Sequence, residues 1–297
     1  MAHRVFYCDH HEIPLPDGHK FPMRKYRLLR DRLSATGLFD LQPAPLASLD
    51  QVTRVHDAAY AQAFVDGTLD PQMMRRIGFP WSPGLVQRTL ASVGSTLAAS
   101  RVALETGWGG GLAGGTHHAF RDAGSGFCIF NDMAVAIAVL RAEGRIGRVA
   151  IVDLDVHQGD GTATLFADDP ETLTISLHGR NNFPFRKQQS KFDIEFEDGA
   201  TDEEYLPEVA RVLDRVREFS PDIIYFQSGV DALATDRLGK LSLTHDGLKQ
   251  RDALVLALPH PLVIVMGGGY SEPVESTVEG HFNTFTAAAA RGAPQPG

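Results

Sequence analysis

Apolar positions along the chain follow two patterns that alternate in sequence. Short apolar runs are typical of buried strands, whereas longer stretches have helical composition. The expected strands are residues 5–7, 149–155, 173–177, 223–227 and 262–266. The expected helices are residues 85–104, 129–143, 202–218 and 244–258, and Thr244 with Asp246 offers capping oxygens at the start of the last one.

This alternation predicts an α/β fold in which helices cover both faces of a parallel sheet. We expect one domain over residues 1–297, since a chain of this length can bury one large core. Residues 40–49 and 74–84 each contain two prolines and indicate loops, and the Ala-, Gly- and Pro-rich residues 287–297 predict a flexible tail. In parallel sheets, ligands bind beyond the carboxyl ends of the strands, so functional residues are sought there.

The end of the second expected strand carries the strongest chemical signal. Asp153, Asp155 and His157 alternate with apolar residues, so an extended backbone would place all three on one face. Two carboxylates and an imidazole on a buried face need a partner, because isolated buried charge is costly. A divalent metal is the commonest partner for these ligand types, and the sequence therefore indicates a metalloenzyme.

A tetrahedral zinc with an open position for water needs a third protein ligand. Asp231 follows the apolar run at residues 223–226 and would reach the same rim of the sheet. Alone, this aspartate would more often cap the next turn or helix. Its matching position on the rim favours a ligand.

His117 and His118 form a tandem pair in a glycine-rich loop. Such a pair binds metal or exchanges protons, although adjacent loop histidines are often only solvated. If Asp155 takes the metal, Asp153 and Asp160 remain to accept hydrogen bonds from the Nδ1 atoms of the two imidazoles. These surplus carboxylates favour the functional interpretation.

Two glycine-rich segments flank these candidates. Residues 107–115 lack the Gly-Lys-Ser/Thr ending of a phosphate-binding loop, so we expect their glycines to let the backbone pack around the histidine pair. Residues 267–269 precede Tyr270, whose hydroxyl would donate to a developing oxyanion. Without the other motifs, Tyr270 would equally suit an ordinary residue on the rim.

The composition of the chain narrows its possible partners and its cellular location. The 28 Lys and Arg and 37 Asp and Glu residues give a net charge of −9, which argues against nonspecific nucleic-acid binding and suits a cationic substrate. Cys8 and Cys128 are too few for a disulfide framework, and neither a signal peptide nor a bilayer-spanning stretch is present. We expect a cytoplasmic protein without a membrane partner; nothing in the sequence indicates its oligomeric state.

Taken together, the motifs resemble the zinc-dependent histone deacetylase superfamily, over almost the whole chain from His19 to Tyr270. The matching segments are His117-His118-Ala, Ser125-Gly-Phe-Cys128, Phe130-Asn-Asp132, Asp153-Leu-Asp-Val-His-Gln-Gly-Asp160-Gly, Ser228-Gly-Val-Asp231 and Gly267-Gly-Gly-Tyr270. The segments Asp202-Glu-Glu-Tyr205 and Asp236-Arg-Leu-Gly-Lys-Leu-Ser-Leu-Thr are most similar to class IV and related bacterial enzymes. This resemblance implies the arginase/deacetylase fold, with a parallel sheet of about eight strands.

The resemblance also implies roles for the site residues. Asp155, His157 and Asp231 would hold one catalytic Zn²⁺. The remaining catalytic residues would be His118 as general base and acid with Asp160, His117 with Asp153, and Tyr270 as oxyanion donor. Gly126 and Phe127 would line a narrow channel for the acyl-lysine chain. The segment after His178 departs from the class I pattern, so both Phe183 and Phe185 are candidates for a second channel aromatic.

A structural K⁺ or Na⁺ is implied as well, held by oxygen ligands of Asp153, Asp155, His157, Ser176 and Leu177. The expected activity is hydrolysis of an N-acyl-lysine or related N-acyl amine to a free amine and a carboxylate. Alternatives are an acetylpolyamine or other small-molecule amidohydrolase, a dinuclear arginase-like hydrolase, and a zinc-binding module without turnover. Acyl-chain length and the physiological target do not follow from the sequence.

Overall fold

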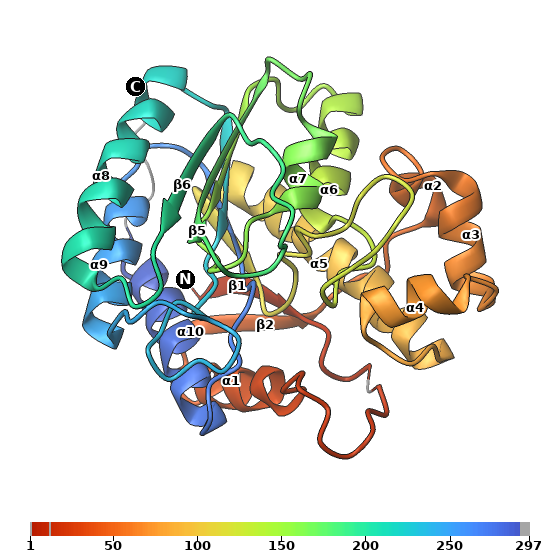
Figure 1. Cartoon of the computed structure of the whole chain (residues 1–297). Coiled ribbons are helices and arrows are strands. Elements are labelled where there is room, and N and C mark those ends of the chain that lie inside the picture. The colour runs from red at the N-terminus through yellow and green to blue at the C-terminus, as the bar shows by residue number, and fades with distance from the viewer. Residues whose placement is uncertain (1, 12, 292–297) are drawn as a thin grey trace.

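A computed structural model describes residues 2–11 and 13–291. Eight strands form one sheet in which all pairings are parallel, and helices pack on both sides of it (Figure 1). The strands are β1 (His3–Tyr7), β2 (Phe39–Pro43), β3 (Trp108–Gly111), β4 (Val149–Asp153), β5 (Thr172–Gly179), β6 (Phe192–Phe196), β7 (Ile223–Gln227) and β8 (Leu262–Val265). Their order across the sheet is β2-β1-β3-β8-β7-β4-β5-β6. The predicted α/β fold is confirmed.

The helices form a layer on each face of the sheet. One layer contains α1 (Arg24–Ser34), α8 (Asp202–Phe219), α9 (His245–Leu256) and α10 (Val274–Ala289). The other is built on α5 (Pro83–Thr106) and α6 (Asp132–Ala142), and α2 (Leu49–Val52), α3 (Ala58–Asp66) and α4 (Pro71–Ile77) contribute to the same hydrophobic cluster. A short helix, α7 (Asp160–Leu165), follows β4.

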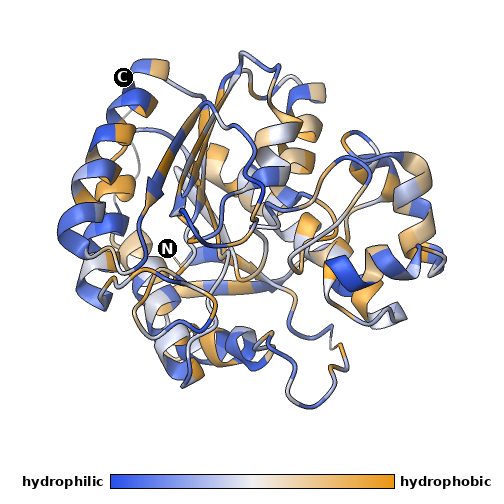
Figure 2. Cartoon of the chain, in the orientation of Figure 1, coloured by the Kyte–Doolittle hydropathy of each residue, from blue (hydrophilic) through white to orange (hydrophobic). Residues whose placement is uncertain are grey.

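Strand pleating divides the core between these layers. In β4, Ala150 and Val152 pack into the cluster that includes α8, whereas Val149 and Ile151 pack into the cluster around α5 and α6. The strand is buried on both faces, as its continuous apolar run predicts. Figure 2 shows hydrophilic residues on the outer side of α8 and hydrophobic residues along the strands.

The candidate residues come from four neighbouring strands. β3, β8, β7 and β4 are adjacent in the sheet, and their carboxyl ends lead to His117 and His118, Tyr270, Asp231, and Asp155, respectively. Because the strands are parallel, these ends meet at one edge. The topology thus brings together side chains that are far apart in sequence.

Several boundaries differ from the sequence predictions. The strand expected over residues 149–155 ends at Asp153, so Asp155 and His157 lie in the loop beyond it rather than on a strand face. The loop expected at 40–49 contains most of β2, which pairs with β1 at the edge of the sheet and there tolerates Pro43.

The second expected loop, 74–84, contains the end of α4 and the start of α5. Both helices have a proline in the first turn, after Asp70 or Ser82 as the N-cap, and proline is favourable there. The expected flexible tail is also wrong in part: residues 287–289 belong to α10, and Arg291 donates to the carbonyl oxygens of Leu258 and His260. Residues 292–297 lie outside the described part of the chain.

Candidate active site

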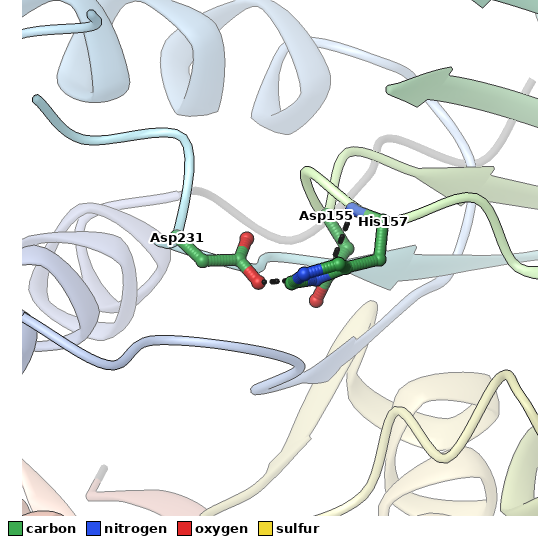
Figure 3. Close-up of side chains that lie close together, drawn as sticks. All are labelled: Asp155, His157 and Asp231. Carbon is green, nitrogen blue, oxygen red and sulfur yellow. Dashed lines mark hydrogen bonds and ion pairs between the residues drawn. The ribbon is translucent and has the colours of Figure 1, made fainter. Parts of the chain in front are cut away.

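A compact cluster lies beyond β4 and β7. One ligand atom from each of Asp155, His157 and Asp231 lies within 4.8 Å of the other two, and all three residues are buried. The His157 Nδ1 donates to Asp155 Oδ1 at 3.0 Å and to Asp231 Oδ2 at 3.1 Å, so the imidazole lies between the carboxylates (Figure 3). The three predicted metal ligands therefore converge.

The electrostatics of this cluster favour a cation. Burial acts to lower the pKa of His157, but Asp155 and Asp231 together raise it to about 10. Burial and the charge of Asp155 raise the pKa of Asp231 to about 7. The two buried carboxylates thus stabilise positive charge at this point, and a divalent ion suits the two-oxygen, one-nitrogen donor set.

Backbone groups hold both carboxylates from behind. Gly268 N–H donates to Asp155 Oδ2 at 2.6 Å, and Val156 N–H donates to Asp231 Oδ1 at 2.9 Å. A Cβ at Gly268 would lie 1.8 Å from Asp231 Oδ2, so this position has no room for a side chain. The glycine loop after β8 therefore packs directly against the candidate metal ligands.

Both predicted histidine–aspartate pairs are present. His117 Nδ1 donates to Asp153 Oδ2 at 2.7 Å, and His118 Nδ1 donates to Asp160 Oδ1 at 2.7 Å. The two imidazole centroids are 4.0 Å apart. Each aspartate fixes the orientation of one ring and leaves its Nε2 free of that bond.

The two histidines differ in charge. Burial acts to lower the pKa of His117, but Asp153 and Asp155 raise it to about 9. Burial and the charged His117 lower the pKa of His118 to about 4, against the opposing effect of Asp160. His118 is therefore neutral near pH 7, the form in which an imidazole accepts a proton.

Asp132 anchors the loop that carries the histidines. Its carboxylate accepts from the N–H groups of Gly115 and Thr116 at 3.0 and 2.7 Å, and from the hydroxyl of Thr96 at 2.5 Å. Asp132 is completely buried at the start of α6. Asp132 thus joins the histidine loop to α5 and α6.

Tyr270 lies near the cluster and lines the same pocket. Its ring centroid is 6.4 Å from that of His157, and its backbone N–H donates to Asp236 Oδ2 at 2.6 Å. Burial, with the charges of Asp155 and Asp231, raises the pKa of the phenol well above its usual value. The phenol therefore stays protonated and can donate a hydrogen bond.

Aromatic rings surround the approach to these residues. Phe127 adopts a left-handed backbone conformation, with φ of 66°, and its ring packs near Phe79 and Tyr270. Phe183 stands edge-on to His118 at 4.8 Å between centroids, whereas Phe185 is 86% exposed. Of the two candidates for a second channel aromatic, Phe183 is the one in contact with His118.

One pocket joins these features. It has about 770 Å³ of empty volume, its open mouth included, and is lined by His118, Gly126, Phe127, Asp155, His157 and Tyr270. A buried cluster that could hold a metal ion, beside a neutral imidazole and a protonated phenol, is suited to polarising and hydrolysing a carbonyl compound.

Comparisons with known proteins agree with this chemistry. The histone deacetylase domain model matches residues 19–285. The chain belongs to the histone deacetylase domain family. An uncharacterized Picosynechococcus protein is 44% identical over 95% of this chain and 96% of its own length. A histone deacetylase-like amidohydrolase from Pseudomonas aeruginosa is 31% identical over 87% of this chain and 74% of its own length.

The fold of the family is also seen in a solved structure. An acetylpolyamine aminohydrolase from Burkholderia pseudomallei superposes with a TM-score of 0.79 at 22% sequence identity, covering 98% of this chain and 100% of that one. The chain is accordingly a histone deacetylase-like hydrolytic enzyme with the arginase/deacetylase fold. Among the described residues, no helix has the length and apolar character needed to cross a membrane.

The residues expected around a monovalent cation lie next to the deacetylase site. Asp153 pairs with Ser176 across β4 and β5, and Ser176 Oγ is 2.9 Å from His178 Nδ1. The carboxylate of Asp153 already accepts from His117 and from Asp155 N–H. These contacts place Asp153 between the histidine pair and β5.

Two supporting residues were missed by the sequence analysis. Arg251 is completely buried, and its Nη1 donates to the Gly229 carbonyl at 2.6 Å, two residues before Asp231. Gln227 Nε2 lies 3.5 Å from Asp155 Oδ2. A charged residue within a helix gives no sign of burial in the sequence, whereas Gln227, at the end of an apolar strand, could have been suspected.

Proposed function

We propose that this protein is a zinc-dependent deacylase that hydrolyses N-acyl-lysine, or a related N-acyl amine, to a free amine and a carboxylate. The observation that carries this proposal is the pocket that Asp155, His157 and His118 line together. Asp231 and Asp160 are hydrogen-bonded to His157 and His118, respectively. The family membership of the chain supports the same reaction class.

Asp155, His157 and Asp231 would hold the zinc ion. Three protein ligands of this kind are typical of catalytic rather than structural zinc. When bound, the ion would polarise the amide carbonyl and increase the acidity of water. The residues around it can supply the remaining chemistry.

His118 is proposed as the general base. His118 is neutral near pH 7. Its Nδ1–H donates to Asp160, so Nε2 is the nitrogen that remains to accept a proton. Its Nε2 would take a proton from the attacking water and later deliver it to the departing amine. Asp160 would stabilise the imidazolium that forms between these steps.

His117 and Tyr270 are proposed to stabilise charge. The charged His117, held by Asp153, would favour negative charge developing on the substrate. The protonated Tyr270 hydroxyl would donate to the oxyanion formed when water adds to the carbonyl. Both residues line the pocket that contains Asp155 and His157, so both could reach the substrate carbonyl there.

The channel indicates how the amine side is held. Phe127 and Phe183 would flank the methylene chain of a lysine, and the Gly126 carbonyl would accept from the amide N–H. The Cys128 thiol also lies 3.4 Å from this carbonyl oxygen. A flexible alkyl amine would fit between such rings without requiring a particular peptide sequence.

We further propose that K⁺ or Na⁺ binds beside β5. Its ligands would be the carboxylate of Asp153, the carbonyl oxygens of Asp153, Asp155, His157 and Leu177, and the Ser176 hydroxyl. An all-oxygen set suits a hard monovalent cation. The ion would reinforce the loop that presents Asp155 and His157.

The substrate class is tested with a panel of acetyl-lysine peptides, longer acyl-lysine peptides and acetylpolyamines. We expect peptide hydrolysis that chelation abolishes and zinc restores, and that Tyr270→Phe reduces by about 10²–10³-fold. Tyr7→Phe, which alters a tyrosine outside the pocket lining, serves as the control. Exclusive turnover of acetylpolyamines would instead establish the small-molecule alternative, and full activity of Tyr270→Phe would exclude the proposed oxyanion donor.

A further inference from the structure

One stripe of α5 forms a wall of the active-site pocket. Leu85, Arg88, Thr89 and Ser92 all line it, and their spacing places them on one helical face. Leu85 continues the apolar lining, whereas the next three residues bring polar groups into the same space. The pocket therefore has a polar region that the proposed metal and proton-transfer chemistry does not use.

Arg88 is the charged residue of this stripe. It is only 7% exposed, its Nη1 donates to the Cys8 carbonyl at 3.2 Å, and its guanidinium lies 4.3 Å from the Tyr26 ring centroid. It makes no salt bridge within residues 2–11 and 13–291. The nearby Asp9 pairs with Arg30 at 3.0 Å instead.

The charge of Arg88 is retained despite its burial. Burial acts to lower the pKa of Arg88, but Cys8, Tyr26 and Asp9 more than offset this effect. A second buried cation, Lys25, lies on the same tyrosine, with Nζ 5.2 Å from the Tyr26 ring centroid. Positive charge thus collects at this wall, in contrast to the carboxylates of the metal cluster.

The neighbouring hydroxyls are available as well. Thr89 is buried, and Ser92 is partly exposed. Neither side-chain hydroxyl makes a hydrogen bond to another described residue. Three residues that line the pocket therefore carry hydrogen-bond donors, namely the guanidinium of Arg88 and the hydroxyls of Thr89 and Ser92.

Such a set is suited to a carboxylate. Burying an arginine without an ionic partner is costly in free energy. A carboxylate can accept two parallel hydrogen bonds from the planar guanidinium group. With the amine side of the substrate in the aromatic channel, the acyl side would extend from the metal cluster toward α5. A carboxylate at the far end of the acyl group would then meet Arg88.

We propose that the pocket accepts acyl groups that end in a carboxylate, bound by Arg88 with Thr89 and Ser92. This inference rests on the proposed deacylase function and specifies its acyl substrate as a monoamide of a short dicarboxylic acid. Water adds to the amide carbonyl, the C–N bond breaks, and the products are a free amine and a dicarboxylic acid. Water is the only co-substrate, and no oxidant or reductant is required.

The test compares kcat/KM for lysine peptides bearing malonyl, succinyl or glutaryl groups with peptides bearing alkanoyl groups of equal carbon number. We expect at least one carboxylated group to be preferred by about 10-fold or more, and Arg88→Met to reduce its kcat/KM on the order of 100-fold. In Arg88→Met the ratio of kcat/KM for the carboxylated peptide to that for the alkanoyl peptide should therefore fall by about 10-fold or more. Arg101→Met, on the exposed surface of the same helix, is the matched control.

A wild-type preference for every alkanoyl group over its carboxylated counterpart would overturn the proposal, even if Arg88→Met failed to fold. Equal loss of acetyl and carboxyacyl hydrolysis in a folded Arg88→Met would also overturn it, because Arg88 would then be only a structural anchor.

A binding measurement separates this inference from the proposed function. Thermal unfolding is followed with glutarate, succinate or butyrate. Stabilisation of wild type by a dicarboxylate, absent with butyrate and lost in Arg88→Met, supports the carboxylate site even if no amide is hydrolysed. Equal shifts in wild type and Arg88→Met would contradict the site while leaving the deacylase proposal standing.

Discussion

The backbone N–H of Gly268 donates to Oδ2 of Asp155 at 2.6 Å, and a Cβ at Gly268 would lie 1.8 Å from Oδ2 of Asp231. The loop after β8 thus contacts two candidate metal ligands from different strands. Its position and the positions of those carboxylates depend on each other.

Gly268→Ala should therefore displace Asp231 and reduce both zinc affinity and activity by about 10²-fold or more. Zinc affinity is measured by competition with a chelator, and activity with an acetyl-lysine reporter. Gly147→Ala is the control, because its Cβ would meet Asp222 at an ordinary 3.4 Å. Unchanged zinc affinity in Gly268→Ala would show that the loop does not position the ligands.

His118→Ala should lower kcat by about 10²–10⁴-fold, the usual contribution of general acid–base catalysis. The zinc content should stay the same, because His118 is not one of the proposed ligands. His10→Ala, which removes an exposed histidine, provides the control. If His118→Ala kept its kcat but lost zinc, His118 would be a metal ligand rather than the general base.

Stability should fall in acid partly because of His56. Its Nε2 accepts from Asn131 N–H at 2.8 Å, and burial lowers its pKa from 6.5 to about 4. Between pH 6.5 and about pH 4, His56 binds a proton more readily in the unfolded chain than in the folded protein. The free energy of unfolding therefore falls as the pH is lowered through that window. The loss reaches about 1.4 kcal/mol per pH unit for one group.

Urea unfolding of wild type and His56→Gln at several values between pH 7 and pH 4.5 measures this effect. Glutamine keeps an acceptor for Asn131 but does not titrate, so its stability should depend less on pH. If the free energy of unfolding depended on pH equally in the two proteins, His56 would not contribute to the loss of stability in acid.

Arg251→Met should destabilise the fold by about 3–5 kcal/mol, because it leaves Asp252 buried without its partner. The Arg251 Nη2 lies 2.8 Å from Asp252 Oδ1, and both side chains are buried. Replacing Asp252 by leucine as well should recover part of the loss. Arg215→Met, at an exposed ion pair, should change the free energy of unfolding by less than about 1 kcal/mol. Chemical denaturation measures the free energy of unfolding of the three variants.

The sequence predicted those parts of the structure in which apolar runs end in polar side chains. β7 was predicted with its observed bounds, and the convergence of Asp231 with Asp155 and His157 followed from the parallel strands. β3 was missed, because its glycines carry no apolar pattern. They allow close packing instead: a Cβ at Gly109 would lie 2.2 Å from the Ala99 carbonyl oxygen.

Other features depend on tertiary packing. Arg88 and Arg251 are of a residue type that is usually exposed, and only the packed structure shows that both are buried. Similarly, Phe183 and Phe185 are two residues apart, yet one contacts His118 and the other is exposed. Such differences arise from how a loop folds over the site, which residue types and spacing do not specify.

The central claim is that Asp155, His157 and Asp231 hold a single zinc ion needed for amide hydrolysis. It is tested most directly by adding zinc to the metal-free protein while following hydrolysis of an acetyl-lysine reporter and, in parallel, the bound zinc. The account predicts that activity rises in proportion to bound zinc, saturates at one equivalent per chain, and is absent in Asp231→Asn. Saturation at two equivalents, or activity that does not depend on bound metal, would contradict it.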